Sequence, residues 1–434
     1  MSRSSPSIEP HLPATVAAPT VICPAAVPGR PSQTSILVLA ACAAFSVANV
    51  YYAQPLLDAL SLEFGIAQAA AGSLVTATQV GSMLALLLVL PLGDLISRKR
   101  LMGGELGLLF VALLAVSWTS STLVLMLGMV ALGLLGTAAT QGAIAYAATL
   151  AVPADRGRVV GLVQSGVLVG VLGSRSLAGL VADLAGWRAV FLVSAALAGV
   201  TLLLIVWQLP KAPVAGVSLS YGRLLLTMFT LLRSERVLQV RGVLGFLVFA
   251  AFGAFWSAIV LPLRVAPHHL SHSAVGALGL VGMAGALAAA RAGRWADAGR
   301  GEQTTALGLA LLAASWACIA QLPHSMAALL LGIVLLDLGG QAVHVTNQSM
   351  IFKGRPELHS RLVGCYMLFY ASGLGAGAIS ATAIYATHGW TGVCWFGFSV
   401  STLAFAFWAT TRHHVDLVSS RSLTHQGDAD GCSR

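Results

Sequence analysis

Apolar runs of membrane-spanning length recur along most of this chain and constrain its fold more than any other feature. A helix needs about 20 mostly apolar residues to cross the hydrocarbon core of a bilayer, and we find twelve such runs. In hydrocarbon, backbone N–H and C=O groups must be satisfied within their own segment unless the chain closes into a barrel. Barrel strands would alternate apolar and polar residues, which these runs do not. The predicted helices are 35–54, 69–93, 101–119, 121–150, 159–182, 187–208, 238–263, 273–293, 304–322, 325–350, 361–385 and 390–410.

Charge is scarce in this chain and unevenly placed. Charged residues make up 9% of the sequence, whereas they make up about 25% of soluble domains. Nearly all lysines and arginines fall in alternate predicted loops and in the tails, and the loops between these carry almost none. Cytoplasmic loops of membrane proteins are enriched in these residues, so we expect both termini in the cytoplasm. The formal net charge of +9 then reflects topology and contact with the lipid bilayer, and no nucleic-acid partner is expected.

The second half of the sequence repeats landmarks of the first half at a constant offset of 203 residues. Several unrelated residue types coincide at this offset over about a hundred positions, which is typical of an internal repeat. The aligned pairs are Asp94 with Asp297, Pro153 with Pro356, Arg158 with Arg361, Gly161 with Gly364, Gly186 with Gly389, and Trp187 with Trp390.

The repeat and the spans together predict an all-α polytopic membrane protein with twelve transmembrane helices in two parallel six-helix pseudo-repeats. The copies share one orientation because an even number of spans separates them. Repeated prolines in a small-residue context predict disorder at the N-terminus. The predicted parts are a disordered cytoplasmic N-terminal tail (1–34), an N-terminal six-helix bundle (35–208), a cytoplasmic linker (209–237), a C-terminal six-helix bundle (238–410) and a cytoplasmic C-terminal tail (411–434).

The stretch "PLGDLISRKRLM" places an acid and several cations directly after an apolar run. Asp94 precedes Arg98 and Lys99, and the second copy places Asp297 before Arg300. A cation cluster after a span can simply mark its cytoplasmic end. An acid at the end of a span, however, is costly without a compensating charge. We therefore expect these residues to form a gate whose ion pairs favour one arrangement of the two halves over the other.

This stretch resembles the loop motif G-x-L-A-D-R-x-G-R-K of the major facilitator superfamily at four positions, Leu92, Asp94, Arg98 and Lys99. It departs from the motif at four others, with Leu90 for the first Gly, Gly93 for the Ala, Leu95 for the first Arg and Ser97 for the second Gly. Other stretches, such as "NVYYAQPLLDALSLEFGI" and "PADRGRVVGLVQSGVLVG", are similar to a bacterial branch of export proteins in that superfamily. The resemblance covers about residues 35–410. It implies the superfamily fold, transport by alternating access, a cytoplasmic gate at the loop motif, and a central cavity lined by the first, fourth, seventh and tenth helices.

A polar stripe crosses the tenth predicted helix. Asp337, Gln341, His344 and Gln348 follow at steps of four, three and four residues, which places them on one helical face. Ionisable residues inside a membrane are functional candidates by default, and either Asp337 or His344 could carry a proton. The alternative is that these groups hydrogen-bond to neighbouring helices and fix their packing. By the resemblance, the stripe faces the central cavity.

Arg175 lies in the glycine-rich stretch "GVLVGVLGSRSLAG" of the fifth predicted helix. It either recognises an anionic group of the substrate or forms a structural pair within the bundle. Glu105, near the start of the third helix, is expected to reach the cytoplasmic edge. Tyr52 fits either an aromatic belt at the membrane surface or the cavity lining. Further candidates for substrate or proton binding are Asn49, Gln79, Gln141 and Asn347.

Several other kinds of site are not supported. Six cysteines are scattered without a CxxC pair, which argues against a disulfide framework or a zinc site. The loop sequence "PHHLSH" contains His268, His269 and His272, which could bind a metal or sense pH. We expect this loop to be exposed and without an acid partner, so we assign it neither role. Phosphate-binding and hydrolase motifs are absent from the sequence, so no enzyme activity and no cofactor are expected.

The sequence thus predicts a secondary transporter in a bacterial inner membrane. It would act as a monomer and move a small-molecule substrate by alternating access, and we expect export driven by the proton gradient. The alternatives are a facilitative uniporter or importer, a non-transporting sensor or scaffold of the same fold, and a membrane-embedded enzyme. An enzyme would need more catalytic groups at one depth than Asp337 and His344 provide.

Overall fold

The computed structural model describes residues 32–152, 155–210, 220–288, 294–352 and 359–430, and all regular structure within these ranges is helical. Short 3-10 or π segments are labelled η. The elements are α1 (Gln33–Ala48), η1 (Gln54–Leu56), α2 (Leu57–Glu63), η2 (Gln68–Ala70), α3 (Ser73–Leu84), η3 (Ala85–Val89), η4 (Leu90–Asp94), α4 (Arg98–Trp118), α5 (Thr122–Leu150), α6 (Arg156–Ala185), α7 (Trp187–Gln208), α8 (Tyr221–Ser234), α9 (Arg236–Ala258), α10 (Val260–Arg264), α11 (His272–Ala288), η6 (Ala296–Arg300), α13 (Gly301–Ile319), α14 (Met326–Phe352) and α15 (His359–Asp430).

Each of the twelve predicted spans falls on a helix. Eight helical stretches of the described chain are long and apolar enough to cross a membrane. One of them, Arg361–Arg412, is 52 residues long and is broken at Gly389, where φ is 63° and ψ is −161°. Only glycine adopts this conformation readily, so the break makes two spans of one stretch. The remaining predicted spans correspond to α1, α11 and α13.

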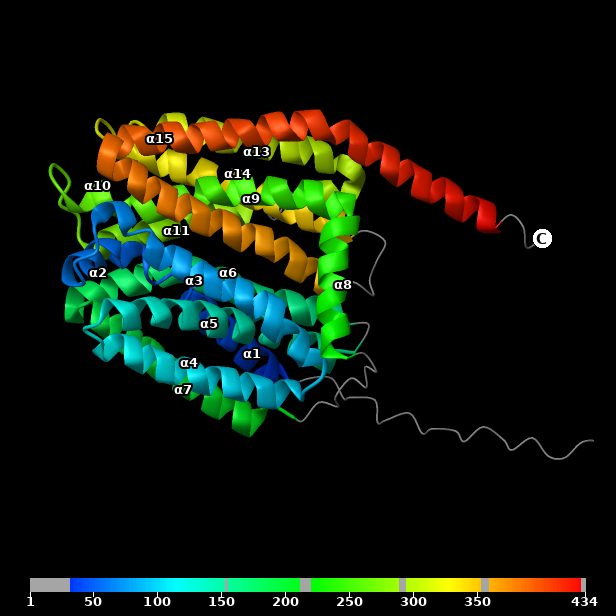
Figure 1. The fold of residues 1–434 in the computed structure, drawn as a ribbon, viewed down its shortest axis with the longest axis horizontal. Coiled ribbons are helices and arrows are strands. Elements are labelled where there is room, and N and C mark those ends of the chain that lie inside the picture. Colours follow the sequence, from blue (N-terminus) through cyan, green and yellow to red (C-terminus); the bar gives the residue numbers. More distant parts are fainter. Residues whose placement is uncertain (1–31, 153–154, 211–219, 289–293, 353–358, 431–434) are drawn as a thin grey trace, which may run out of the picture.

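The spanning helices lie side by side, and α8 crosses them at one end of the bundle (Figure 1). We call this end the α8 end, and the end that carries α2 and α10 the opposite end. The helices before α8 form the N half, and those after it form the C half. The long helix α15 continues past its last predicted span and projects from the α8 end (Figure 1). Most of the predicted N-terminal tail, residues 1–31, lies outside the described residues.

The helix α8 contacts both halves. It lies in the second part of the predicted linker, whose residues 211–219 are outside the described ones. Its Tyr221 hydroxyl donates a hydrogen bond of 2.8 Å to the Leu88 carbonyl of the N half. Its Met228 and Leu231 pack in an apolar cluster with Tyr366 of α15 in the C half.

Equivalent helix pairs of the two halves pack through equivalent glycines. In the N half, a Cβ atom on Gly81 of α3 would lie 1.9 Å from the Val130 carbonyl oxygen of α5. In the C half, a Cβ atom on Gly285 of α11 would lie 2.5 Å from the Val334 carbonyl oxygen of α14. The close approach of these backbones requires a residue without a side chain. Each residue of the second contact follows its counterpart in the first by nearly the offset found in the sequence. The pseudo-repeat is therefore also present in the helix packing.

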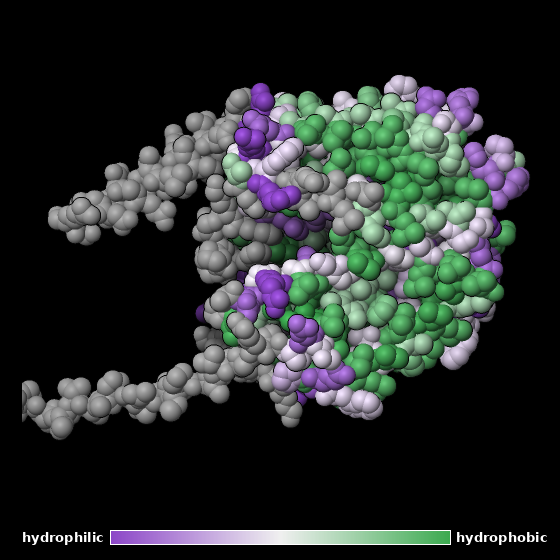
Figure 2. Space-filling model, turned by 180° about the vertical axis from the view of Figure 1, so that it is seen from behind, coloured by the Kyte–Doolittle hydropathy of each residue, from purple (hydrophilic) through white to green (hydrophobic). Residues whose placement is uncertain are grey.

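The two halves touch along α6 with α11 and along α3 with α15. The Ser176 hydroxyl donates a hydrogen bond of 3.0 Å to the Gly276 carbonyl, and the Thr76 hydroxyl donates one of 2.8 Å to the Gly375 carbonyl. These contacts lie towards the opposite end of the bundle. At the α8 end, the molecule is hollowed between the halves (Figure 2). The arrangement is closed at the opposite end and open at the α8 end.

Candidate functional site

Asp337, the first residue of the predicted polar stripe, is fully buried and points towards α11. A Cβ atom on Gly282 of α11 would lie 2.7 Å from Asp337 Oδ2, and one on Gly285 would lie 3.1 Å from Asp337 Cβ. These two glycines therefore make room for the carboxyl group. Neither carboxyl oxygen has a hydrogen-bond partner. An acid without partners is costly to keep charged away from water.

The remainder of the stripe lies further towards the α8 end. His344 Nδ1 is 3.1 Å from the Tyr366 hydroxyl, and Gln348 Nε2 is 3.3 Å from His344 Nε2. His344 also packs edge-on against Phe249, with 5.1 Å between the ring centroids. It therefore faces α9 and α15, whereas Asp337 faces α11. Residues of the predicted stripe therefore enter two different environments along α14.

Arg175 of α6 is buried, with 2% of its surface exposed. Its Nε donates a hydrogen bond of 3.0 Å to Gln54 Oε1, and its Nη1 donates one of 3.1 Å to the Val171 carbonyl. The guanidinium carbon lies 4.2 Å from the ring centroid of Trp256 and 5.3 Å from that of Tyr51. Since Trp256 belongs to α9, this cation–π contact joins the two halves. The remaining nitrogen, Nη2, has no hydrogen-bond partner.

Arg175 and Asp337 flank the same part of α11. A Cβ atom on Gly279 would lie 3.4 Å from Arg175 Cβ, and Gly282, one helical turn further along, abuts Asp337. Both side chains are described, and they interact electrostatically without forming an ion pair. The site therefore contains a buried cation from the N half and a buried acid from the C half at similar depth.

Further buried polar atoms at this depth have no hydrogen-bond partner. Such atoms are rare in folded proteins and call for an explanation. In the residues that contact the arginine they are Gln54 Nε2 and Trp256 Nε1, and elsewhere Ser257 Oγ of α9 and Gln79 Nε2 of α3 are also unpartnered.

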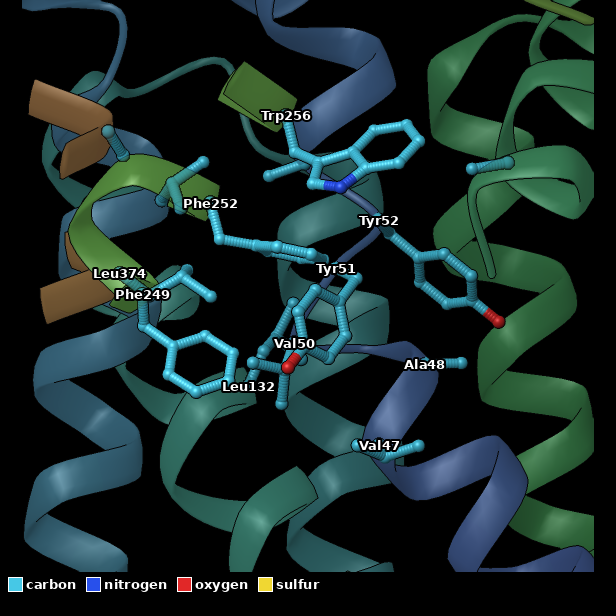
Figure 3. Close-up of a cluster of buried hydrophobic side chains, with 14 of the residues drawn as sticks. Val47, Ala48, Val50, Tyr51, Tyr52, Leu132, Phe249, Phe252, Trp256 and Leu374 are labelled. Carbon is cyan, nitrogen blue, oxygen red and sulfur yellow. The ribbon is translucent and has the colours of Figure 1, made fainter. Parts of the chain in front are cut away.

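An aromatic layer joins the two halves beside Arg175. The hydroxyls of Tyr51 and Tyr370 are 2.7 Å apart and join the halves. Tyr370 packs on Phe249, with 3.8 Å between ring centroids, and Tyr51 and Phe249 point towards each other in Figure 3. His344 belongs to the same layer and lies about 10 Å along α14 from Asp337, at 1.5 Å per residue.

Three other predicted residues lie elsewhere. Tyr52 points away from Tyr51 (Figure 3), and its buried hydroxyl has no partner. Asn49 accepts a hydrogen bond of 2.7 Å from Ser194 of α7, within the N half. Asn347 donates one of 3.3 Å to the Arg241 carbonyl, within the C half. Asn49 and Asn347 therefore brace their own halves. Gln141 and Gln341 are half-buried.

The predicted gating residues lie at the α8 end, in η4, α4 and η6. The side chains of Asp94 and Asp297 are outside the described residues. Lys99 Nζ donates hydrogen bonds to the carbonyls of Val206, at 2.9 Å, and Leu209, at 2.5 Å. It thereby caps the end of α7 within the N half. Arg98 Nη1 lies near Gly93 and Arg300 is exposed, and the gate itself stays a prediction.

Two interpretations of single charged residues are corrected. Arg241, near the start of the predicted span 238–263 and counted there among the cations of the cytoplasmic side, lies in α9 and is buried. It pairs with Glu302 of α13, whose other oxygen accepts a hydrogen bond of 2.6 Å from Trp408. Glu105 does not reach the edge of the bundle but is buried, and its Oε2 has no partner.

The opposite end carries a polar cluster that sequence reasoning missed. Arg264 Nε donates a hydrogen bond of 2.8 Å to Asp58 Oδ2. His272 Nε2 lies 3.1 Å from Asp58 Oδ1, and His272 Nδ1 lies 3.2 Å from Asp183 Oδ1. Asp183 also accepts hydrogen bonds of 3.0 and 2.7 Å from the backbone N–H groups of His272 and Ser273, at the start of α11. The expectation that the loop histidines lack an acid partner is therefore wrong for His272. The sequence offered one signal of this cluster. Arg264 is a cation in a set of loops that otherwise carries almost none.

Comparison with known proteins is consistent with this geometry. The sequence model of the Major Facilitator Superfamily matches residues 37–297. The uncharacterized transporter YgaY of Escherichia coli O157:H7 is 38% identical over 385 residues, covering 89% of this chain and 97% of that protein. The purine ribonucleoside efflux pump NepI of Escherichia coli O127:H6 is 27% identical over 188 residues, covering 42% of this chain and 46% of that protein.

The fold also matches a solved transporter structure. The crystal structure of a bacterial homologue of the human lysosomal transporter Spinster superposes with a TM-score of 0.65 at 13% identity. The superposition covers 90% of this chain and 97% of that one. The sequence match over more than half of the chain, the relative of nearly equal length and the shared fold agree. The chain is therefore a multi-pass membrane transporter of the major facilitator superfamily.

Proposed function

We propose that this protein exports a small organic solute across the bacterial inner membrane by alternating access, in exchange for protons. The concentration of cations in the loops at the α8 end supports a cytoplasmic location for that end. The structure then corresponds to a form that is open to the cytoplasm and closed to the outside. Rocking the halves about the charged pair would close the α8 end and open the opposite end.

The single observation that carries proton coupling is the burial of Asp337 without a hydrogen-bond partner. For exchange, Asp337 would take up a proton when the opposite end is open and release it towards the α8 end when water or cargo reaches it there. Coupling requires that the proton bind the two arrangements unequally. The position of Asp337 supports this condition. Arg175 of α6, in the other half, packs against the same stretch of α11 and would move relative to Asp337 when the halves rock.

The direction of transport is inferred from a relative. NepI is named as an efflux pump, and its match to part of this chain supports export. Its cargo is not transferred to this protein.

The test uses purified protein in liposomes that carry a pH gradient, with a panel of small organic solutes. We expect wild type to exchange labelled for unlabelled solute and to accumulate solute against its gradient when the pH gradient is present. Asp337→Asn should keep the exchange and lose the gradient-driven accumulation. Glu105→Gln is the matched control, because it also neutralises a buried acid but one that lies within the N half.

The outcomes separate the alternatives. Full gradient-driven accumulation in Asp337→Asn would exclude Asp337 as the proton carrier. Loss of it in Glu105→Gln alone would assign the proton to Glu105. Wild type that exchanges solute but ignores the pH gradient would be a uniporter, and wild type that exchanges none of the panel would favour a sensor.

A further inference from the structure

His272 occupies the seam between the halves at the opposite end, far from Asp337. It begins α11 in the C half, and both of its ring nitrogens face carboxylates of the N half. Nε2 lies 3.1 Å from Asp58 of α2, and Nδ1 lies 3.2 Å from Asp183 of α6. The imidazole therefore bridges two elements of the N half.

This geometry determines how many protons the ring carries. An ionised carboxylate can only accept hydrogen bonds, and a neutral imidazole has only one N–H group to donate. Both contacts are hydrogen bonds only if both ring nitrogens carry a proton. With a neutral ring, one nitrogen lone pair would face a carboxylate oxygen.

The charges around His272 favour its protonated form. Burial alone would raise the pKa of Asp58, but hydrogen bonds from His272 and Arg264 outweigh it and keep the pKa below its ordinary value of 3.8. Asp183 is held by two backbone N–H groups as well as by the ring. The hydrogen bond to Asp58 raises the pKa of His272 above its ordinary value of 6.5, against the opposing effects of burial and of Arg264.

We propose that Asp58, Asp183, Arg264 and His272 form a proton-binding latch, which takes up one proton at His272 when the halves close at the opposite end and releases it when they part. The opening of this end is the alternating-access step proposed above, whereas the proton site rests on the contacts of the closed form. In the described part of the chain, no group of three or more His, Cys, Asp or Glu side chains is arranged to hold a metal ion.

The sign of the pH effect follows from linkage. The closed latch binds the proton more tightly than the parted one, in which His272 regains its ordinary pKa. Low pH at the opposite end therefore stabilises the closed arrangement. That stabilisation is lost as the pH rises through the raised pKa that His272 has in the closed form. An acidic exterior would thus hold the transporter open to the cytoplasm even without cargo. This is a second proton site, separate from Asp337.

The test measures the distance across the opposite end by double electron–electron resonance as a function of pH. Spin labels are placed at Leu184 in the N half and Gln321 in the C half, both exposed, after replacement of the native cysteines. We expect the long-distance population of wild type to grow as the pH rises above about 6.5, the ordinary value for histidine. His272→Gln should lose this pH response, and His268→Gln, in the same loop, should keep it.

A second variant and a direct titration of His272 distinguish loss of the proton site from a general change in structure. His272→Lys, a permanent cation at these pH values, should stay in the short-distance form as the pH rises. In carbon-13 spectra of labelled histidine, the resonance missing from His272→Gln should titrate above 6.5 in wild type. An unchanged pH midpoint in His272→Gln, or titration of His272 at or below its ordinary value, would overturn the latch. Neither the spin-label distance nor the histidine titration requires cargo. A failure of the transport proposal would therefore appear in the liposome assay alone.

Discussion

Arg175 and Asp337 face the same stretch of α11 from opposite halves of the molecule, one helical turn apart, and do not form an ion pair. Each is buried, and each has polar atoms without a hydrogen-bond partner. Opposite charges in a low-dielectric interior compensate each other even at a separation beyond direct contact. This charge compensation depends on the closure of the two halves, because one charge belongs to each half.

The first prediction tests this coupling. When Asp337 is ionised, removing either charge alone should destabilise the protein, because the other charge then stays buried without compensation. Arg175→Gln combined with Asp337→Asn should therefore cost less than the sum of the single changes, with a coupling free energy of about 1 kcal/mol. Thermal unfolding of the four proteins in detergent measures it. Strict additivity would show that the two groups do not sense each other.

The second prediction concerns the ion pair across the seam at the opposite end. Asp58 and Arg264 are partly exposed, so breaking their pair by Arg264→Gln should weaken closure of that end by about 1 kcal/mol or less. The population open at this end should rise up to about fivefold, as reported by the same spin-label distance. Arg188→Gln is the control, because Arg188 pairs with Glu63 within the N half. An equal shift in the control would mean that the pair across the seam has no special role.

The third prediction uses glycines to separate closure from folding. A Cβ atom on Gly276 would lie 2.3 Å from the Arg175 carbonyl oxygen of the other half. Gly276→Ala should therefore part α6 from α11 and raise the population open at the opposite end, with little change in thermal stability. Gly285→Ala, which crowds α14 within the C half, should lower the melting temperature instead. Gly173→Ala is the reference, because no atom lies within 4 Å of its added methyl group. Identical behaviour of Gly276→Ala and Gly173→Ala would contradict the seam contact.

The fourth prediction concerns the loop motif. Asp94→Asn should slow the interconversion of the two open forms more than it weakens cargo binding, because the acid is predicted to stabilise one arrangement of the gate. Single-molecule fluorescence energy transfer across the α8 end measures the rates. Unchanged rates would remove Asp94 from the gate.

The spans and the repeat could be predicted from the sequence because both leave a one-dimensional signal. A helix in lipid must be apolar over its full length, and its ends appear where that run stops. The break at Gly389 also coincided with the predicted boundary between the last two spans. The face shared by Asp337 and His344 followed from helical spacing alone.

Pairings between distant residues could not be predicted, because hydropathy does not specify which loops meet. Asp58 and His272 are 214 positions apart, and their contact depends on how the halves dock. The burial of Glu105 and Arg241 was missed for a related reason. Charges near the end of a span can reach water or turn inward, and packing against neighbouring helices decides which.

The contacts of α8 with both halves have a mechanical consequence. The helix packs on α15, yet its first residue, Tyr221, is hydrogen-bonded to the Leu88 carbonyl near the start of the loop motif. A rotation of one half against the other must carry α8 with one partner and slide it past the other. We therefore expect the hydrogen bond to Leu88 to limit how far the α8 end can widen, and loosening α8 should change the amplitude of the motion while leaving the charged pair intact.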